Sequence, residues 1–173
     1  MGCGNNEHVS GHHDKNQRCV CDVVRAIKDI QDQAENNCGP CPTSCFLEPL
    51  GGLVSPSRNN ADTRVFMLLT KDGDPFKAFF RDLTPRPHDN DCVSVFFRVE
   101  DIFDNCCATL RVLEPLDAQR HGVNLLNGDG TKIDFKQICK VRNFDLTGSC
   151  VTVDLNCFCG IECVADVFLD VCD

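Results

Sequence analysis

The sequence predicts a mainly β protein: a β-sandwich or jelly-roll-like domain preceded by an N-terminal amphipathic helical arm. Two observations carry this prediction. Several short segments alternate apolar and polar residues with a period of two, which is typical of half-buried strands. One segment near the N-terminus instead repeats apolar residues at helical spacing. Turn signals rich in Gly, Pro, Asn and Asp separate about seven strand segments, the pattern of an all-β domain.

The composition limits the kinds of partner that the chain can bind. It has 173 residues, with 17 Lys and Arg against 26 Asp and Glu, and a formal net charge of −9. This length allows one sizeable core, and the acidic balance repels phosphate, so we expect no nucleic-acid partner. No apolar run approaches the ~20 residues of a membrane span, and residues 1–18 lack the apolar stretch of a secretory signal. We therefore expect no membrane partner either.

Fifteen cysteines are the most unusual feature of the composition. Such density is typical of an oxidising setting, although a chain without a secretory signal is made in a reducing one. Either the thiols bind metal, or they are oxidised after the producing cell has lysed. Because the number is odd, full oxidation within one copy leaves at least one thiol without an internal partner. That thiol either stays free or forms a disulfide with another copy.

Residues 1–18 are polar and lack an apolar repeat, which predicts a disordered tail. Cys3, His8, His12 and His13 in this segment are residue types that bind metal. A metal site needs a fold that holds its ligands together, and this tail has none of its own. We therefore interpret the segment as a solvated tail.

Residues Cys19–Asn37 repeat apolar side chains along one stripe, which predicts an amphipathic helix. The helix opens a Cys-rich arm at 19–50, and a linker at 51–60, rich in Gly, Ser and Pro, separates it from an all-β domain at 61–173. The stripe either packs on the parent domain or forms a seam with other copies. Because the linker separates the arm, we choose the seam and predict an assembly helix. Its contact residues are Val20, Val23, Val24, Ile27 and Ile30.

The motif C-G-P-C-P-T-S-C at Cys38–Cys45 contains a C-x-x-C pair, which serves either as half of a zinc site or as a redox centre. A thioredoxin-like redox pair opens a helix that follows a strand, whereas this pair follows a helix. Redox catalysis is thus disfavoured. A structural zinc set completed by Cys157, Cys159 and Cys163 stays open, although their spacings match no standard zinc pairing.

Four strands are expected in the first half of the β domain. Val65–Thr70 and Phe76–Arg81 flank an Asp-Gly turn signal, and Val93–Val99 and Cys106–Leu113 follow. The last of these segments begins with two adjacent cysteines. Because neighbouring residues of a strand point to opposite faces, one of the two thiols must face outward. We predict that the second, Cys107, does so.

The C-terminal part carries the densest group of thiols. We expect one helical turn at Ile133–Cys139 and then a hairpin around a Thr-Gly turn, with its strands at Val141–Leu146 and Cys150–Cys157. Gly160 predicts a bulge or a sheet corner. Thiols on the apolar face of the alternation should be buried packing groups or internal disulfides. These are Cys106, Cys157, Cys159 and Cys163. Thiols at polar or flexible positions should bridge to other copies. These are Cys3, Cys21, Cys107, Cys150 and Cys172.

No residue pattern in the chain predicts an active site. His88 or His121 could pair with a thiol, but fifteen thiols would exchange disulfides with a catalytic one. The sequence has no phosphate-binding Gly loop, G-x-S-x-G elbow or H-E-x-x-H helix. We therefore expect no enzymatic activity and no cofactor.

Several segments together resemble one known family. They include C-V-C-D-V-V-R-A-I at Cys19–Ile27, C-P-x-x-C at Cys41–Cys45, A-D-T-R-V-F-M-L-L-T-K-D-G-D-P-F-K-A-F at Ala61–Phe79 and C-V-T-V-D-L-N-C-F-C-G-I-E-C at Cys150–Cys163. In this order, and over nearly the whole chain, the sequence resembles the spore coat Y/Z family of endospore-forming bacilli. That family includes CotY, CotZ and the exosporium protein ExsY.

The resemblance implies a structural role. Members of the family self-assemble into disulfide-linked, two-dimensional hexagonal sheets in the outermost spore layer, the crust or the exosporium. They are made in the mother-cell cytoplasm and persist after that cell lyses. The implied partners are other copies of the chain, as a hexamer lattice, and other spore coat or exosporium proteins. From the residues alone, the alternatives are a cysteine-rich structural zinc-binding module and a thiol oxidoreductase.

Overall fold

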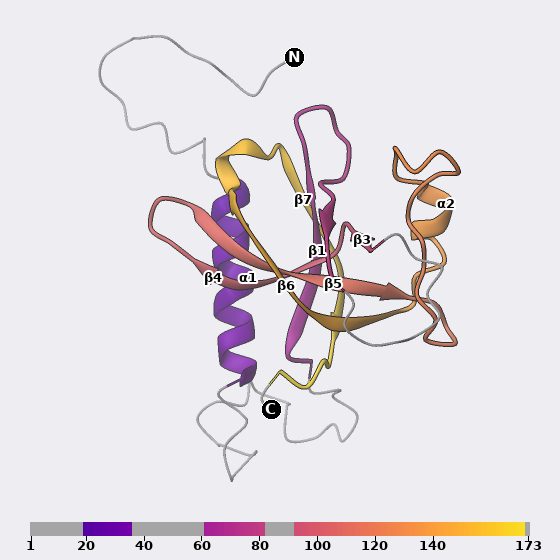
Figure 1. Ribbon diagram of the computed structural model, residues 1–173. Helices are drawn as coiled ribbons and strands as arrows, with labels where there is room; N and C mark the ends of the chain where they lie inside the picture. Colours follow the sequence, from indigo (N-terminus) through magenta and orange to yellow (C-terminus); the bar gives the residue numbers. More distant parts are fainter. Residues whose placement is uncertain (1–18, 36–60, 82–91, 172–173) are drawn as a thin grey trace.

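The computed structural model of the protein describes residues 19–35, 61–81 and 92–171 (Figure 1). Its helices are α1 (Cys19–Glu35) and α2 (Phe135–Ile138), with a 3-10 helix, η2, at Leu155–Cys157. Its strands are β1 (Thr63–Leu69), β2 (Ala78–Phe79), β3 (Val93–Ser94), β4 (Phe97–Ile102), β5 (Cys107–Leu116), β6 (Asn143–Asp154) and β7 (Gly160–Val167). The chain is therefore mainly β with an N-terminal helix, which confirms the predicted fold class.

Five strands form one antiparallel sheet in the order β6-β5-β4-β1-β7, and β2 and β3 form a separate two-stranded sheet. β1 pairs with β7 along its whole length, but it meets β4 at a single pair, Phe66 and Phe97. β6 and β7, which are neighbours in sequence, are thus the two edge strands of the larger sheet.

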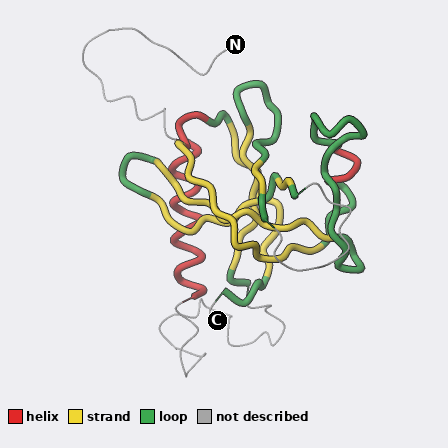
Figure 2. Tube along the Cα trace, in the orientation of Figure 1, coloured by secondary structure: helices red, strands yellow, loops and turns green. Residues whose placement is uncertain are grey.

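Apolar side chains pack on both faces of this sheet, as the two-sided apolar pattern of β1 predicts. Phe66 and Leu68 belong to a buried cluster that includes the inner residues of α1. Val65 and Met67 belong to a second cluster, which residues from α2 and the loops after β5 border. Figure 2 shows α1 on one side of the strands and α2 with neighbouring loops on the other. The sheet therefore lies between two layers in a sandwich-like arrangement.

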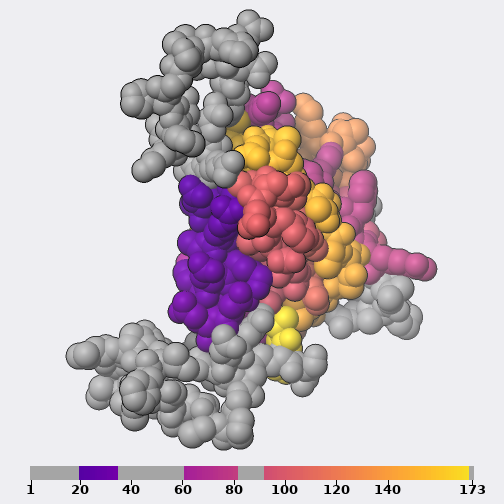
Figure 3. All heavy atoms as spheres, turned by 90° about the vertical axis from the view of Figure 1, so that its left-hand side faces the viewer, coloured from indigo at the N-terminus to yellow at the C-terminus, as the bar shows by residue number. Residues whose placement is uncertain are grey.

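Helix α1 packs on the sheet, which corrects the expectation of an arm that contacts other copies. Val20, Val24 and Ile27 are buried in the same cluster as the inner side chains of β1 and β4, and Val23 packs against it. Of the five predicted contact residues, Ile30 alone is exposed, at 47%. Figure 3 shows the indigo helix lying along the neighbouring strands. The apolar stripe is buried on the nearest apolar surface, which is the chain's own sheet.

The predicted tail at 1–18 and linker at 51–60 lie outside the described residues, as does the motif at Cys38–Cys45. Within the described residues, neither helix has the length and apolar character that crossing a membrane requires.

Strand β6 corrects the predicted Thr-Gly hairpin, because the chain runs through this point as one strand and pairs with β5 on both sides of it. The pairing shifts between Arg111 and Leu113, so residues 147–149 oppose Val112 as a bulge. The Thr147 hydroxyl donates a hydrogen bond to the Val112 carbonyl at 2.6 Å, which holds the bulged residues in the strand.

The chain leaves β6 at η2, earlier than the corner predicted at Gly160. The carboxylate of Asp154 accepts the N–H of Asn156 at 2.9 Å and so caps this short turn. Leu155 is buried, and its N–H donates to the Cys106 carbonyl at 3.0 Å. The two-residue alternation is therefore interrupted here, and the cysteines that follow do not continue the buried face of β6.

Two other predicted strands are divided or shortened. Val93–Val99 divides into β3 and β4, because the Ser94 hydroxyl accepts the N–H of Phe96 at 3.1 Å and bends the chain between them. Phe76–Arg81 is reduced to the two residues of β2.

Candidate functional site

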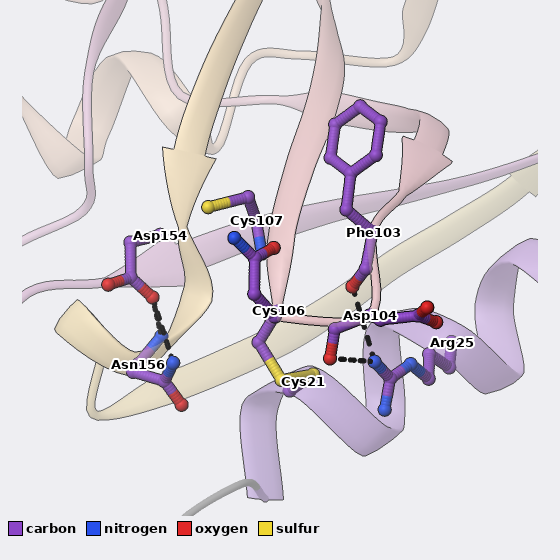
Figure 4. Close-up of a disulfide and its surroundings, with 9 residues drawn as sticks. Cys21, Arg25, Phe103, Asp104, Cys106, Cys107, Asp154 and Asn156 are labelled. Carbon is purple, nitrogen blue, oxygen red and sulfur yellow. Dashed lines mark hydrogen bonds between the residues drawn. A yellow bond between two sulfur atoms is a disulfide. The ribbon is translucent and has the colours of Figure 1, made fainter.

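A disulfide between Cys21 and Cys106 fastens α1 to the start of β5 (Figure 4). The two Cα atoms lie 5.7 Å apart and the residues are 85 positions apart in sequence. Both side chains are buried in the cluster between helix and sheet. In the chain-entropy model, closing a loop of this size stabilises the fold by about 4–5 kcal/mol. The bond therefore holds the helix on the sheet from inside the core.

The loop between β4 and β5 positions Cys106 for the disulfide with Cys21. This residue has a φ of 65°, in the left-handed region, and its N–H donates to the Phe103 carbonyl at 3.0 Å. From the helix, Nη2 of Arg25 donates to the carbonyls of Phe103 and Asp104, each at 3.2 Å. Figure 4 shows these two bonds beside the disulfide. Helix and loop are thus joined by one covalent bond and by hydrogen bonds from a charged donor.

The disulfide corrects the role expected for Cys21. The helical pattern places this residue away from the apolar stripe, which predicts a bridge to another copy, yet it is 1% exposed and bonded within the chain. The physical reason is that the β4–β5 loop covers a second side of α1. Cys106 lies in an internal disulfide, one of the two environments that the apolar face predicts for it.

Four other cysteines in the described part of the chain carry exposed, free thiols: Cys139, Cys150, Cys157 and Cys163. Cys150 lies on edge strand β6, and Cys163 lies on the opposite edge strand, β7. Cys157 ends η2, and Cys139 follows α2. Exposed thiols can form disulfides with another molecule, provided that the other molecule brings a sulfur within reach.

The exposure of Cys157 and Cys163 corrects their predicted burial. Leu155 takes the last buried place before the turn, and the turn directs the following residues to the surface. Cys159 is exposed as well, although it is disulfide-bonded. Among the predicted bridging residues, Cys150 is exposed and Cys107 is half-buried. Cys3 and Cys172 lie outside the described residues.

Cys139 is an exposed thiol that our sequence reasoning missed. It caps the C-terminal end of α2 with a helical φ of −64°. Ile133 and Ile138 pack against the second cluster, while Phe135, four residues before Cys139, is 62% exposed. The predicted helical turn could have identified Cys139 as exposed. Phe135 and Cys139 are four positions apart and share one face of the turn, and the two isoleucines mark the opposite face, which packs against the second cluster.

A polar network joins the start of β1 to the segment that follows β7. Arg98, which is 3% exposed, donates from Nη1 to the Asp62 carbonyl at 3.2 Å and from Nε to Glu100 at 3.1 Å. The Asp62 carboxylate accepts the N–H groups of Leu169 and Val171 at 2.9 and 3.2 Å. These bonds satisfy the buried charges and fix the segment that follows β7.

Hydrogen bonds also hold two carboxylates as anions. Two bonds of 2.7 Å join Arg64 to Asp166; they lower the pKa of Asp166 and raise that of Arg64. The backbone N–H of His121 donates to Asp117 at 2.9 Å and lowers the pKa of that carboxyl. The imidazole of His121 lies 3.6 Å from the same carboxylate, so its neighbour is an acid and not a thiol.

The structure brings together no group of three or more His, Cys, Asp or Glu side chains placed for a metal ion within 19–35, 61–81 and 92–171. One cysteine of the alternative zinc set, Cys159, is disulfide-bonded, whereas a cysteine binds metal as a free thiolate. The partner half of that set, Cys38–Cys45, and the histidine at 88 lie outside the described residues.

This fold defines a cysteine-rich, mainly β protein with a buried internal disulfide and further thiols at its surface. A family model described as Spore coat protein Z matches residues 1–166. Spore coat protein Z of Bacillus subtilis (strain 168) is 34% identical over 152 residues, which cover 87% of this chain and 90% of that protein. No solved structure matches the chain. The chain belongs to the spore coat protein Z family, which confirms the resemblance drawn from its sequence.

Proposed function

We propose that this chain is a structural protein of the spore surface whose copies assemble into a two-dimensional, disulfide-cross-linked lattice. Membership of the spore coat protein Z family supports a structural role in the spore coat. The proposal of cross-linking is based on four exposed free thiols, which the described part of the chain has in addition to a buried disulfide. One class of cysteine stabilises the fold, and the other is available to neighbours.

The positions of the thiols favour an extended array over a closed pair. Cys150 and Cys163 lie on the two opposite edges of the five-stranded sheet, and Cys139 lies beyond α2. Edge strands readily pair with further chains, and contacts on more than one side let each copy hold several neighbours. A hexagonal sheet built from hexamers is one such array.

The proposed location is the crust or the exosporium, reached after synthesis in the mother-cell cytoplasm. A reducing cytosol keeps surface thiols free while copies assemble, and lysis of the mother cell then exposes them to oxidants. Other spore coat or exosporium proteins that present a thiol in register are the further partners that we propose. No enzymatic step is needed for this role.

Electron microscopy of the purified full-length chain tests the proposal. We expect ordered sheets in reducing buffer, and we expect these sheets to resist hot detergent only after oxidation. A chain that stays monomeric over all accessible concentrations would contradict the lattice. Stoichiometric zinc in the purified protein, with unfolding on its removal, would instead favour the cysteine-rich zinc-binding module.

A further inference from the structure

The segment around α2 forms a cationic surface on an acidic protein. Residues 131–142 hold four cations and one carboxylate, Asp134, which caps α2 by accepting the N–H of Lys136 at 2.9 Å. The four cations make no ion pair within the described residues. An exposed phenyl ring and a free thiol lie among them. We define the basic face as the exposed residues Lys132, Phe135, Lys136, Cys139, Lys140 and Arg142.

Edge strand β7 and the segment after it form an anionic surface. Residues 160–171 hold three carboxylates and no cation. Apart from Asp166, which pairs with Arg64, these carboxylates make no ion pair in the described part of the chain. Val164 and Phe168 are 40% and 57% exposed, and a free thiol precedes them. We define the acidic face as the exposed residues along this edge of the sheet, whose side chains project to both sides of it: Glu162, Cys163, Val164, Asp166, Phe168 and Asp170.

The two faces are complementary but lie apart on one molecule. Figure 1 shows α2 at the right and β7 nearer the centre, and no ion pair joins the two faces within the described residues of one copy. Contact between two copies would bring opposite charges together and cover both exposed phenyl rings, Phe135 and Phe168. It would also place the exposed thiols of Cys139 and Cys163 in one interface.

We propose that the acidic face of one copy docks on the basic face of a second copy. This inference rests on the proposed function, because it names a contact through which the copies assemble. Since the two faces differ, the contact is heterologous, and each copy in a pair keeps one face free for a further neighbour. Repetition of the contact gives a closed ring or an extended array, whereas a face that bound itself would stop at a dimer.

Charge reversal on each face, followed by mixing, tests the docking. One variant carries Lys136→Glu and Lys140→Glu; the other carries Glu162→Lys and Asp170→Lys. In reducing buffer, which removes any effect of disulfides, each variant alone should need at least ~10-fold more protein than the parent to form sheets, because like charges then meet. An equimolar mixture should assemble at about the concentration of the parent, since the reversed basic face of the first variant fits the reversed acidic face of the second, and their two unchanged faces also fit each other.

The matched control carries Lys71→Glu and Arg81→Glu, which change the net charge as much as the first variant but lie on neither face, and it should assemble like the parent. Thermal unfolding followed by circular dichroism establishes that all variants are folded. Sheets from each variant alone at the parent's concentration would overturn the docking and leave the proposed function standing. Folded variants that fail to assemble when mixed would also overturn it. A parent chain that forms no sheets would instead overturn the proposed function itself.

Discussion

Arg64 and Asp166 face each other across β1 and β7 and are joined by two hydrogen bonds of 2.7 Å. The pair joins edge strand β7 to β1, the neighbouring strand of the sheet. Both side chains are partly exposed, at 30% and 49%, so solvent screens their attraction. A pair of this kind contributes at most about 1 kcal/mol to stability, even with bidentate geometry.

Asp166→Asn should therefore destabilise the fold by less than ~1 kcal/mol at neutral pH. The hydrogen bond from Arg64 lowers the pKa of Asp166 in the folded state. A lowered folded pKa gives a contribution that is present above the unfolded value of about 4 and is lost as pH falls through the folded value. Urea unfolding at several pH values should show the difference between parent and variant shrinking to zero in acid. Asp72→Asn, in an exposed turn, is the control and should show no such difference.

The Cys21–Cys106 disulfide should account for a large share of stability under oxidising conditions. Replacement of both residues by Ala should lower the free energy of unfolding by about 4–5 kcal/mol, because the unfolded chain loses a long closed loop. In the presence of reductant the parent loses the same loop, so the two proteins should differ much less. Cys150→Ala, at an exposed position, should change stability little in either condition. An equal loss with and without reductant would assign the effect to core packing and not to the bond.

Gln31 is a buried polar residue on the inner face of α1, and it positions the helix. Its Nε2 donates to the Val99 carbonyl at 2.9 Å, and its Oε1 accepts the N–H of Arg64 at 3.3 Å. Gln31→Leu leaves both backbone groups without these partners and should cost about 1–3 kcal/mol. Gln33→Leu makes the same chemical change at an exposed position of the same helix and should cost less than ~0.5 kcal/mol. Chemical denaturation of both variants checks the difference.

Gln31 also shows why the sequence alone does not predict the surface on which α1 packs. Gln31 follows Ile27 by four positions and so lies on the apolar stripe, where it weakens the pattern. Its partner Val99 is 68 positions away, and only the folded chain brings them together. Periodicity therefore identifies the helix and its apolar face, because those depend on local spacing. It does not identify the surface that covers that face.

The strands likewise include features that the sequence predicts and features that it does not. β1 follows from its own residues, since an apolar pattern on both faces requires two packed layers whatever its neighbours are. The Thr-Gly pair in β6 does not, because its role depends on Val112 of the neighbouring strand, whose carbonyl accepts the Thr147 hydroxyl. The exposure of Cys157 and Cys163 depends on the turn at η2, which no Gly or Pro signals. An alternation extended through that turn assigns the wrong face to Cys157 and Cys163.

The native reactivity of the cysteines should separate them into two groups. An alkylating reagent should label Cys139, Cys150, Cys157 and Cys163 rapidly in the folded chain, because their thiols are free and exposed. Cys21 and Cys106 should be labelled only after unfolding in reductant, since they are buried and bonded. Peptide mapping by mass spectrometry measures both groups in one experiment. Rapid native labelling of Cys21 would show that the helix is not fastened to the sheet.

Assembly should precede cross-linking. The synthesis that we propose, in a reducing cytosol, would exclude disulfides as the first contacts. A disulfide also forms only when two Cα atoms are within about 7 Å, which requires neighbours already in register. Each bond then typically adds a few kcal/mol, and a lattice repeats it over many neighbours. A variant with Ser at Cys139, Cys150, Cys157 and Cys163 should therefore still form sheets, but the sheets should dissolve in hot detergent without reductant.

The control for this variant is the parent treated with reductant and hot detergent together, which should dissolve in the same way. Sheets of the fourfold variant that stay as resistant as the oxidised parent would show that other thiols, Cys3, Cys107 and Cys172 among them, form the bridges. Failure of a folded fourfold variant to form sheets, while the reduced parent forms them, would assign the exposed cysteines to the non-covalent contact. If the reduced parent also fails, oxidation comes first and the proposed order is wrong. Electron microscopy before and after oxidation, with the same samples run on non-reducing gels, distinguishes these outcomes.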